Sequence, residues 1–132
     1  YEIGIVNPTE IDKINILNAS ILAMHIAIDK IKIHYELLLI DGPYFRNYKN
    51  KKHKCIIRGD SQFQAIAAAS IIAKTYRDQL MIELHNDFPE YKWSNNKGYP
   101  TKEHKKAIEN FGISVHHRKS YKLVNNQMIL EI

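Results

Sequence analysis

The fold of this 132-residue chain is decided by two stretches, LLLIDG at residues 37–42 and CIIRGD at residues 55–60. In each of them a short run of aliphatic residues leads to a glycine and an aspartate. Such runs, bounded by glycine, are typical of strands that are buried on both faces inside a sheet covered by helices. The sequence therefore predicts an α/β domain with strands at residues 37–40 and 55–57, each followed by an aspartate.

The two aspartates, Asp41 and Asp60, are candidate metal ligands. In open α/β sheets, ligands bind at the carboxyl ends of the strands. Two carboxylates on neighbouring strand ends repel each other, so they are most easily kept together by a hard divalent cation. The alternative is structural, because aspartate before glycine is a common turn residue and Asp60 could cap the helix that follows it. The spacing alone leaves both interpretations open.

Helical patterns surround the two strands. Residues 1–6 resemble a further strand and lead into a predicted helix over residues 8–32, with Asn7 as its cap and apolar side chains every three or four residues. A second helix is predicted over residues 61–85, where serine begins a capping box. A third is predicted over residues 101–110, capped by threonine at its start and by glycine after its end.

The bulk composition bounds the class of protein. With 45% hydrophobic residues, a chain of this length can form one domain with a modest core. Its net charge of +5 suits a polyanionic partner. The single cysteine, Cys55, excludes a disulfide framework and favours a reducing compartment. No apolar run approaches the length of a membrane span and no signal-peptide pattern opens the chain, so we expect a cytoplasmic protein with no membrane partner.

Several segments combine basic and aromatic residues. Residues 44–54 carry five positive charges and three rings, which can hold phosphates and stack on bases, or can form a solvated connection. Residues 116–122 form a second such cluster, either a phosphate-facing patch or plain surface. Tyr99 follows a predicted polar loop at residues 93–97 and is either a core filler or a reader of a sugar. A polar ladder could run along one face of the second helix through Ser70, Lys74 and Asp78.

Five of these segments, taken in order, resemble the motifs of ribonuclease HII. They are LIDG at 39–42, RGDS at 58–61, AAASIIAKTYRD at 67–78, KGYPT at 97–101 and HHRKSY at 116–121. The segment EIDKINIL at residues 10–17 is also similar to that family's helix after its third strand. The resemblance extends over nearly the whole chain and implies an RNase H-like fold, a mixed sheet flanked by helices.

The resemblance also implies an activity. Members of the family are endonucleases that cut the RNA strand of RNA–DNA hybrids, or cut 5′ of ribonucleotides embedded in duplex DNA. They use Mg²⁺ or Mn²⁺ held by four carboxylates, and two of those positions match Asp41 and Asp60. The metal ions activate a water and stabilise the leaving 3′-oxygen, which leaves a 5′-phosphate and a 3′-hydroxyl.

Substrate recognition is implied in the same way. Tyr99 matches the family's junction-reading tyrosine, whose hydroxyl helps to sense the 2′-hydroxyl that distinguishes a ribonucleotide from its DNA neighbours. The expected partner is therefore an RNA–DNA hybrid duplex or DNA with embedded ribonucleotides. Four further residues are expected to contact this substrate: Lys74, Lys97, Gly98 and Arg118.

One family motif is missing from these residues. Family members begin with Asp-Glu-x-Gly-Arg-Gly, which supplies the other two carboxylates, and this motif occurs nowhere in the sequence. We therefore expect residues 1–132 to be a single but partial catalytic domain, covering the last two thirds of a protein that is monomeric when complete. Alone it should be inactive or nearly so. The alternatives are a non-catalytic nucleic-acid-binding remnant and a structural half that requires a separate N-terminal piece.

Overall fold

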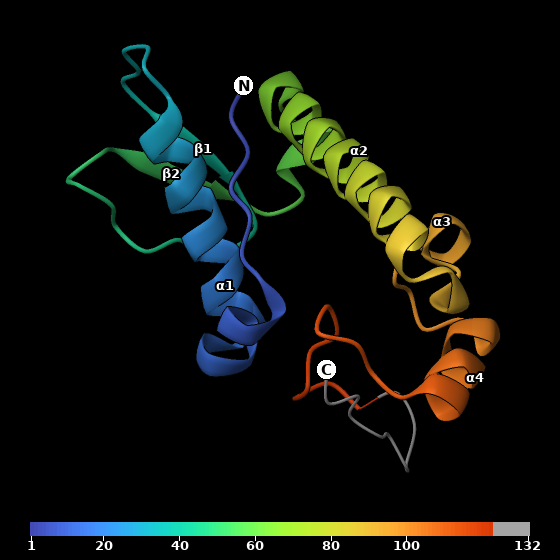
Figure 1. The fold of residues 1–132 in the computed structure, drawn as a ribbon. Helices are drawn as coiled ribbons and strands as arrows, with labels where there is room; N and C mark the ends of the chain where they lie inside the picture. Colours follow the sequence, from blue (N-terminus) through green and yellow to red (C-terminus); the bar gives the residue numbers. More distant parts are fainter. Residues whose placement is uncertain (123–132) are drawn as a thin grey trace. The chain divides into compact units, whose positions relative to one another are not determined.

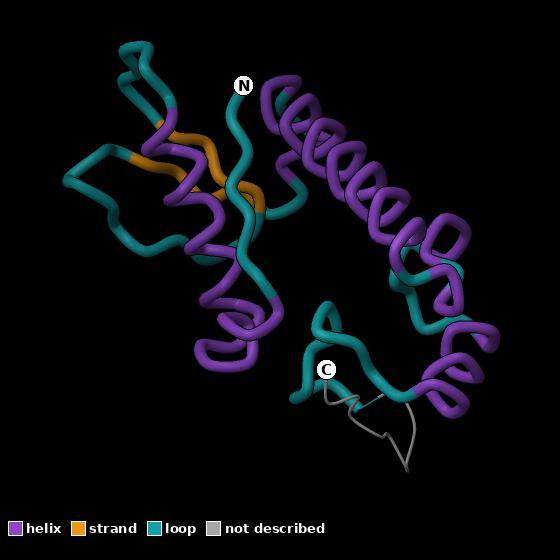
Figure 2. The backbone as a smooth tube through the Cα atoms, viewed as in Figure 1, coloured by secondary structure: helices purple, strands orange, loops and turns teal. Residues whose placement is uncertain are grey.

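Two parallel strands, β1 (Leu38–Asp41) and β2 (His53–Ile56), form the sheet of the computed structural model, which describes residues 1–122 (Figure 2). Asp41 lies opposite Ile56 in the register. The predicted α/β class is confirmed, but β2 begins two residues earlier than predicted and ends one residue earlier. Burial on both faces was also a wrong expectation for these strands, because Ile40 and Ile56 are buried but Asp41 and Lys54 are exposed and the other strand residues are half-buried.

The described residues divide into two compact units. The first contains residues 1–6 and 16–74, and the second contains residues 7–15 and the chain from Thr75 onward. Figure 1 shows two long helices, α1 (Pro8–Lys30) and α2 (Gln64–Asp87). Each contributes residues to both units. Residues 123–132, the end of the predicted domain, lie outside the described residues.

Residues 1–6 do not form the predicted strand. A strand needs a hydrogen-bonded neighbour, and this segment lies against α1 instead. The Lys30 ammonium donates to the Ile3 carbonyl at 2.8 Å. Gly4 is so close to the helix that a Cβ there would lie 1.8 Å from the Ala23 carbonyl oxygen. Glycine is therefore required at position 4 for this contact.

The helix α1 is interrupted. Its start is as predicted, since the Asn7 side chain accepts a hydrogen bond from the Glu10 N–H at 2.8 Å. Asn15, however, has φ 65° and ψ 167°, which are not helical angles. The prediction of one continuous helix was wrong at this residue, and the helix ends at Lys30 rather than at residue 32.

The length and composition of α1 test the expectation that no apolar segment is long enough to span a membrane. Among residues 1–122 it is the helix that is long and apolar enough to cross a membrane, by length and composition only. Core helices of soluble proteins and signal sequences meet the same criterion. The sequence-based statement that no apolar run approaches this length was therefore wrong.

The start of α2 also differs from the prediction. A short 3-10 helix, η1 (Gly59–Ser61), precedes α2, which begins at Gln64. The Ser61 hydroxyl donates to the Arg58 carbonyl at 2.8 Å instead of capping α2. The predicted capping box at residue 61 was therefore wrong, because the serine closes the tight turn before the helix.

A dense aromatic core organises the second unit. It contains Tyr91, Trp93, Ala107, Ile108 and Ile113. The rings of Tyr91 and Trp93 stack with centroids 5.0 Å apart, and the Tyr91 hydroxyl donates to the Gly112 carbonyl at 3.0 Å. The predicted polar loop at residues 93–97 was wrong, because α3 (Trp93–Asn96) forms there and Trp93 is only 2% exposed.

The last helix of the described chain, α4 (Lys102–Phe111), confirms the predicted third helix. The Thr101 hydroxyl accepts from the His104 N–H at 3.2 Å, as an N-cap should. Gly112 follows the helix with φ 77°, a left-handed value that favours glycine. The short 3-10 helix η2 (Pro89–Tyr91) connects α2 to α3.

Candidate functional site

The first candidate site is the carboxyl edge of the two strands. Asp41 is the last residue of β1, and its Oδ1 accepts a hydrogen bond from the Gly59 N–H at 2.9 Å. Gly59 is buried, and a Cβ there would lie 2.6 Å from Ile66 Cδ1 and 3.5 Å from Asp41 Oδ1. The backbone of η1 therefore approaches the Asp41 carboxylate closely, and Asp60 is the next residue of that turn.

The position of Asp60 bears on its two interpretations. It lies within η1, beyond the end of β2 at Ile56, so it is not at the strand end itself. Because α2 begins at Gln64, Asp60 also lies outside the N-cap position of α2. Capping of α2 therefore does not explain this aspartate.

The turn before Asp60 is held in an unusual conformation. Arg58 has φ 54° and ψ 44°, in the left-handed region that non-glycine residues rarely occupy. Its carbonyl accepts hydrogen bonds from the Ser61 hydroxyl at 2.8 Å and from Gln62 Nε2 at 3.3 Å. These side chains hold the turn that presents Gly59 to Asp41.

Asp41 and Asp60 remain candidate donors to a metal ion. Both are exposed, and carboxylate oxygens are the ligands that Mg²⁺ and Mn²⁺ prefer. Within residues 1–122, however, no three His, Cys, Asp or Glu side chains are grouped so that they could hold a metal ion. The donor set thus fits a divalent cation in kind, but a complete site needs ligands besides Asp41 and Asp60.

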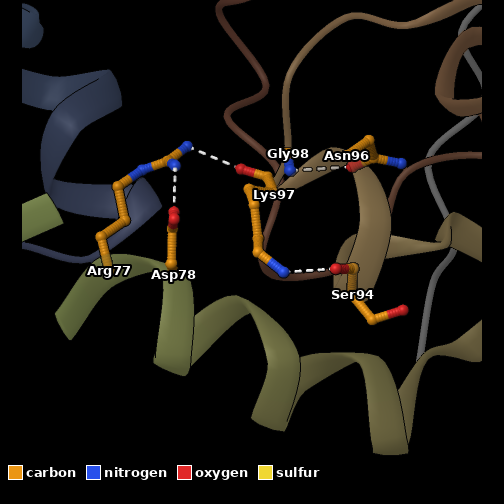
Figure 3. Close-up of polar contacts among 6 residues, drawn as sticks. All are labelled: Arg77, Asp78, Ser94, Asn96, Lys97 and Gly98. Carbon is orange, nitrogen blue, oxygen red and sulfur yellow. Dashed lines mark hydrogen bonds and ion pairs between the residues drawn. The ribbon is translucent and has the colours of Figure 1, made fainter. Parts of the chain in front are cut away.

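The second candidate site is the turn that carries Tyr99, which lies in the second unit. Figure 3 shows the polar contacts of the residues just before Tyr99. Gly98 has φ 78°, and its N–H donates to the Asn96 side chain at 2.8 Å. The Arg77 guanidinium donates to the Lys97 carbonyl at 2.8 Å, and the Lys97 ammonium bonds the Ser94 carbonyl. Both main chain and side chain therefore fix the turn, and the Lys97 charge is partly committed to it.

Tyr99 itself is presented to solvent. Its side chain is 60% exposed, so it is not the core filler that the sequence left as an alternative. The Arg77 guanidinium lies 5.0 Å from the centre of its ring. The Tyr99 carbonyl accepts from the Thr101 N–H at 2.8 Å and lies 3.0 Å from His104 Nδ1. An exposed ring on a fixed backbone is well suited to contact a sugar or base.

The basic segment around Arg118 is organised by an aspartate that sequence reasoning did not single out. The Asp12 carboxylate accepts from the Lys119 N–H at 2.7 Å and from the Ser120 N–H at 3.2 Å. A hydrogen bond from the Ser120 hydroxyl lowers the pKa of Asp12, as do these backbone hydrogen bonds. The Arg118 guanidinium lies 4.6 Å from the Tyr121 ring centre. This segment is thus ordered and carries a half-buried arginine.

The loop at residues 44–54 is only partly available to a ligand. The Tyr48 ring stacks on His25 with centroids 4.1 Å apart, and Phe45 meets His25 edge-on at 5.1 Å. The Tyr48 hydroxyl and the Lys49 ammonium both donate hydrogen bonds to the Asp29 carboxylate. The bond from Lys49 is the main reason that the pKa of Asp29 is lowered. Part of the loop therefore packs on α1, while Tyr44 remains 67% exposed.

The ion pairs of the described residues do not include the predicted pairing of Lys74 with Asp78 along α2. Asp78 pairs with its neighbour Arg77, at 3.7 Å between Nη1 and Oδ1 (Figure 3). Lys74 is exposed on α2 and Ser70 is half-buried. Lys74 is therefore a surface cation of the first unit, whereas Asp78 belongs to the second unit.

Two histidines were missed as part of the site. His104 is 2% exposed and contacts the Tyr99 carbonyl, and it also contacts His117. Little in the sequence marks these two histidines as partners. His104 lies three residues after the predicted cap of a helix, and His117 lies in a basic cluster that is typical of a surface. Only the fold brings them together.

Comparison with known proteins gives the family. The model of the family described as Ribonuclease HII matches residues 1–124. The chain is 50% identical over 131 residues to a "Ribonuclease HII" of Christiangramia forsetii, covering 99% of this chain and 66% of that protein. It is 51% identical over 132 residues to that of Phocaeicola vulgatus, covering 100% of this chain and 66% of that protein.

A third relative, the "Ribonuclease HII" of Porphyromonas gingivalis, is 55% identical over 122 residues, which is 92% of this chain and 61% of that protein. The chain thus spans at most 66% of the length of these three curated relatives. The match confirms the RNase H-like α/β fold class that the motifs predicted. The chain belongs to the ribonuclease HII family.

Proposed function

We propose that this chain supplies two metal-binding carboxylates and the ribonucleotide-reading tyrosine of an endonuclease. The enzyme would cut the RNA strand of RNA–DNA hybrids and would cut 5′ of ribonucleotides embedded in duplex DNA. The observation that carries the proposal is the hydrogen bond from the Gly59 N–H to Asp41, which joins the turn containing Asp60 to the end of β1. Membership of the ribonuclease HII family supports it.

In this function Asp41 and Asp60 would hold Mg²⁺ or Mn²⁺. When bound, the metal would activate a water for attack on the phosphodiester and would stabilise the leaving 3′-oxygen, giving a 5′-phosphate and a 3′-hydroxyl. The Gly59 N–H fixes the orientation of the Asp41 carboxylate before any ion binds. The buried, close-packed Gly59 keeps Asp60 in the adjoining turn.

Substrate recognition would fall to the exposed ring of Tyr99 and to four further residues. The ring would pack near the deoxyribose while its hydroxyl senses the 2′-hydroxyl. Gly98, Lys97, Lys74 and Arg118 would contact the sugar-phosphate backbone, and the net charge of +5 favours a polyanion. The proposed partner is therefore a hybrid duplex or a DNA duplex with single ribonucleotides.

These residues alone are proposed to be inactive or nearly so. The absence of a third ligand near Asp41 and Asp60, within residues 1–122, supports this part of the proposal. An N-terminal segment of the family would complete the site, and the complete protein would be a cytoplasmic monomer. The main alternative is a binding protein without catalysis, which the positive charge and the incomplete donor set also support.

The test is cleavage of an end-labelled DNA duplex with one ribonucleotide, in Mg²⁺ or Mn²⁺. The chain alone is compared with the chain plus an N-terminal segment from a family member. We expect only the mixture to cut, and Asp41→Asn or Asp60→Asn to abolish cutting. Asp87→Asn, at the exposed end of α2, is the matched control and should cut normally.

The other outcomes decide between the alternatives. Binding of the duplex without cutting by either sample would favour the non-catalytic protein. Cutting by the chain alone, lost on Asp41→Asn, would contradict the proposed inactivity and would require another ligand from these residues.

A further inference from the structure

A buried pair of histidines connects the Tyr99 turn to the segment that carries Arg118. His104, on α4, is 2% exposed. Its Nδ1 lies 3.0 Å from the Tyr99 carbonyl oxygen, and its Nε2 lies 3.2 Å from His117 Nε2. His117 directly precedes Arg118 in the chain. The pair therefore touches both elements to which we assign substrate contacts in the second unit.

The neighbours of the pair assign the position of each proton. The Trp93 indole nitrogen can only donate, and it lies 3.4 Å from His104 Nε2, so this nitrogen of His104 accepts. A neutral imidazole has one N–H, so the proton of His104 is on Nδ1 and is donated to the Tyr99 carbonyl.

The same reasoning applies to the second ring. The Ser114 N–H donates to His117 Nδ1 at 3.1 Å. The proton of His117 is therefore on Nε2, from which it is donated to His104. The hydrogen bonds then run from Ser114 through His117 and His104 to Tyr99, and the Trp93 indole is a second donor to His104 Nε2.

Both rings must be neutral for this chain to exist. Protonated His104 would direct an N–H at the donor of Trp93. Protonated His117 would direct an N–H at the Ser114 N–H, and only the Ser114 hydroxyl, 3.0 Å from Nδ1, could accept it. Burial lowers the pKa of His104 and, with the charges of His104 and His116, lowers the pKa of His117 to about 4. The Tyr91 ring, 4.7 Å from His117, completes the apolar surroundings.

We propose that His104 is a positioning residue for ribonucleotide recognition: it fixes the Tyr99 carbonyl through Nδ1–H and links it through His117 to the Arg118 segment. This inference rests on the proposed function, in which Tyr99 reads the 2′-hydroxyl. The ring of Tyr99 is exposed, so its direction depends on how its backbone is held. Loss of the His104 bond should therefore impair discrimination more than overall duplex affinity.

Two substitutions separate the contacts of His104. Asparagine places an amide where Nδ1 was and can still donate to the Tyr99 carbonyl. Glutamine reaches the position of Nε2 and keeps the side facing Trp93 and His117, but not the donor to Tyr99. The probes are a DNA duplex with one ribonucleotide and the same duplex without it. The measured quantity is the Kd for the all-DNA duplex divided by the Kd for the duplex with the ribonucleotide.

We expect His104→Gln to lower this ratio about fivefold, the effect of losing one net hydrogen bond. His104→Asn should retain most of the ratio, and both variants should bind the all-DNA duplex as the unsubstituted chain does. His34→Gln and His34→Asn, at an exposed histidine in the first unit, should change nothing. Equal ratios for His104→Gln and the unsubstituted chain would overturn the positioning role.

A second measurement needs no variant. Long-range ¹⁵N NMR of the histidine rings at pH 7.5 should find His104 protonated at Nδ1 and His117 at Nε2, and His117 should stay neutral down to pH 5.5. The opposite tautomer at His104 would overturn the proposal even if a variant fails to fold. If the unsubstituted chain does not distinguish the two duplexes, the proposed reading by Tyr99 fails, and the positioning role fails with it. If it does distinguish them and only the His104 results disagree, the positioning role alone fails.

Discussion

The backbone N–H of Gly59 donates to Asp41 Oδ1 at 2.9 Å and thereby joins the 3-10 turn η1 to the end of β1. This contact depends on a residue without a side chain at position 59. A Cβ there would lie 2.6 Å from Ile66 Cδ1 and 3.4 Å from Ile56 Cβ. The position of the turn that contains Asp60 is thus linked to the packing of Ile66, on α2, against Gly59.

Gly59→Ala should reduce the free energy of unfolding by about 1–2 kcal/mol, because the new methyl group displaces the end of Ile66. Urea unfolding measures the change. Ile66→Val removes the Cδ1 atom that the methyl group would strike, so Gly59→Ala should cost less in that background. Strictly additive effects of the two substitutions would show that this contact is not the cause.

Gly98→Ala should destabilise the Tyr99 turn by about 1 kcal/mol or more, since an alanine at φ 78° is strained. The added Cβ would also lie 3.2 Å from Met81 Cε. Gly98→Asn, which tolerates left-handed angles better, should cost less than alanine despite its larger side chain. The thermal midpoints of the two variants measure the difference, and a smaller loss for alanine than for asparagine would contradict the conformational explanation.

Asp12→Asn should loosen the segment that contains Arg118. The carboxylate accepts three hydrogen bonds from Lys119 and Ser120, and an amide oxygen accepts them less strongly. The amides of residues 119 and 120 should exchange hydrogen faster with solvent in the variant. Glu10→Gln, on the same helix, serves as the control and should leave these two amides unchanged. Unaltered exchange in Asp12→Asn would show that the segment is held by other contacts.

Acidification should destabilise the chain through His117. Its pKa falls from 6.5 to about 4 in the folded state, mainly through burial, so between these values the unfolded chain binds more protons than the folded one. The resulting stabilisation is complete above pH 6.5 and is lost as the pH falls to 4, by about 3 kcal/mol at most. Urea unfolding from pH 7.5 to 4 measures the loss. His117→Asn should flatten this dependence, and an equally steep dependence in the variant would assign it to other groups.

The local signals in the sequence predicted much of the framework. The aliphatic run before Asp41 forms β1, the asparagine and threonine caps at residues 7 and 101 begin helices, and Gly112 ends the last one. Each of these features depends on a few neighbouring residues, so a single sequence contains the information. Of the two candidate aspartates, Asp41 ends β1 as the strand pattern indicated, whereas Asp60 lies in η1, beyond the end of β2.

The features that the sequence did not reveal depend on distant contacts. Nothing local marks Asn15 as the break in α1, because the apolar spacing continues through it. The polar residues around Trp93 in the sequence predict a loop. In the fold, Trp93 is a core residue because it packs with Tyr91 and Ile108. His104 and Asp12 were missed for the same reason, since their partners lie 13 and more than 100 residues away in the chain.

Trp93 is the single tryptophan of the chain, and it donates its indole N–H to His104 within the core of the second unit. Its fluorescence is therefore an intrinsic signal of the state of that unit. A neutral imidazole in contact with the indole leaves the emission largely unquenched, whereas a protonated one would reduce it. An emission titration can thus follow the charge of the histidine pair without any label.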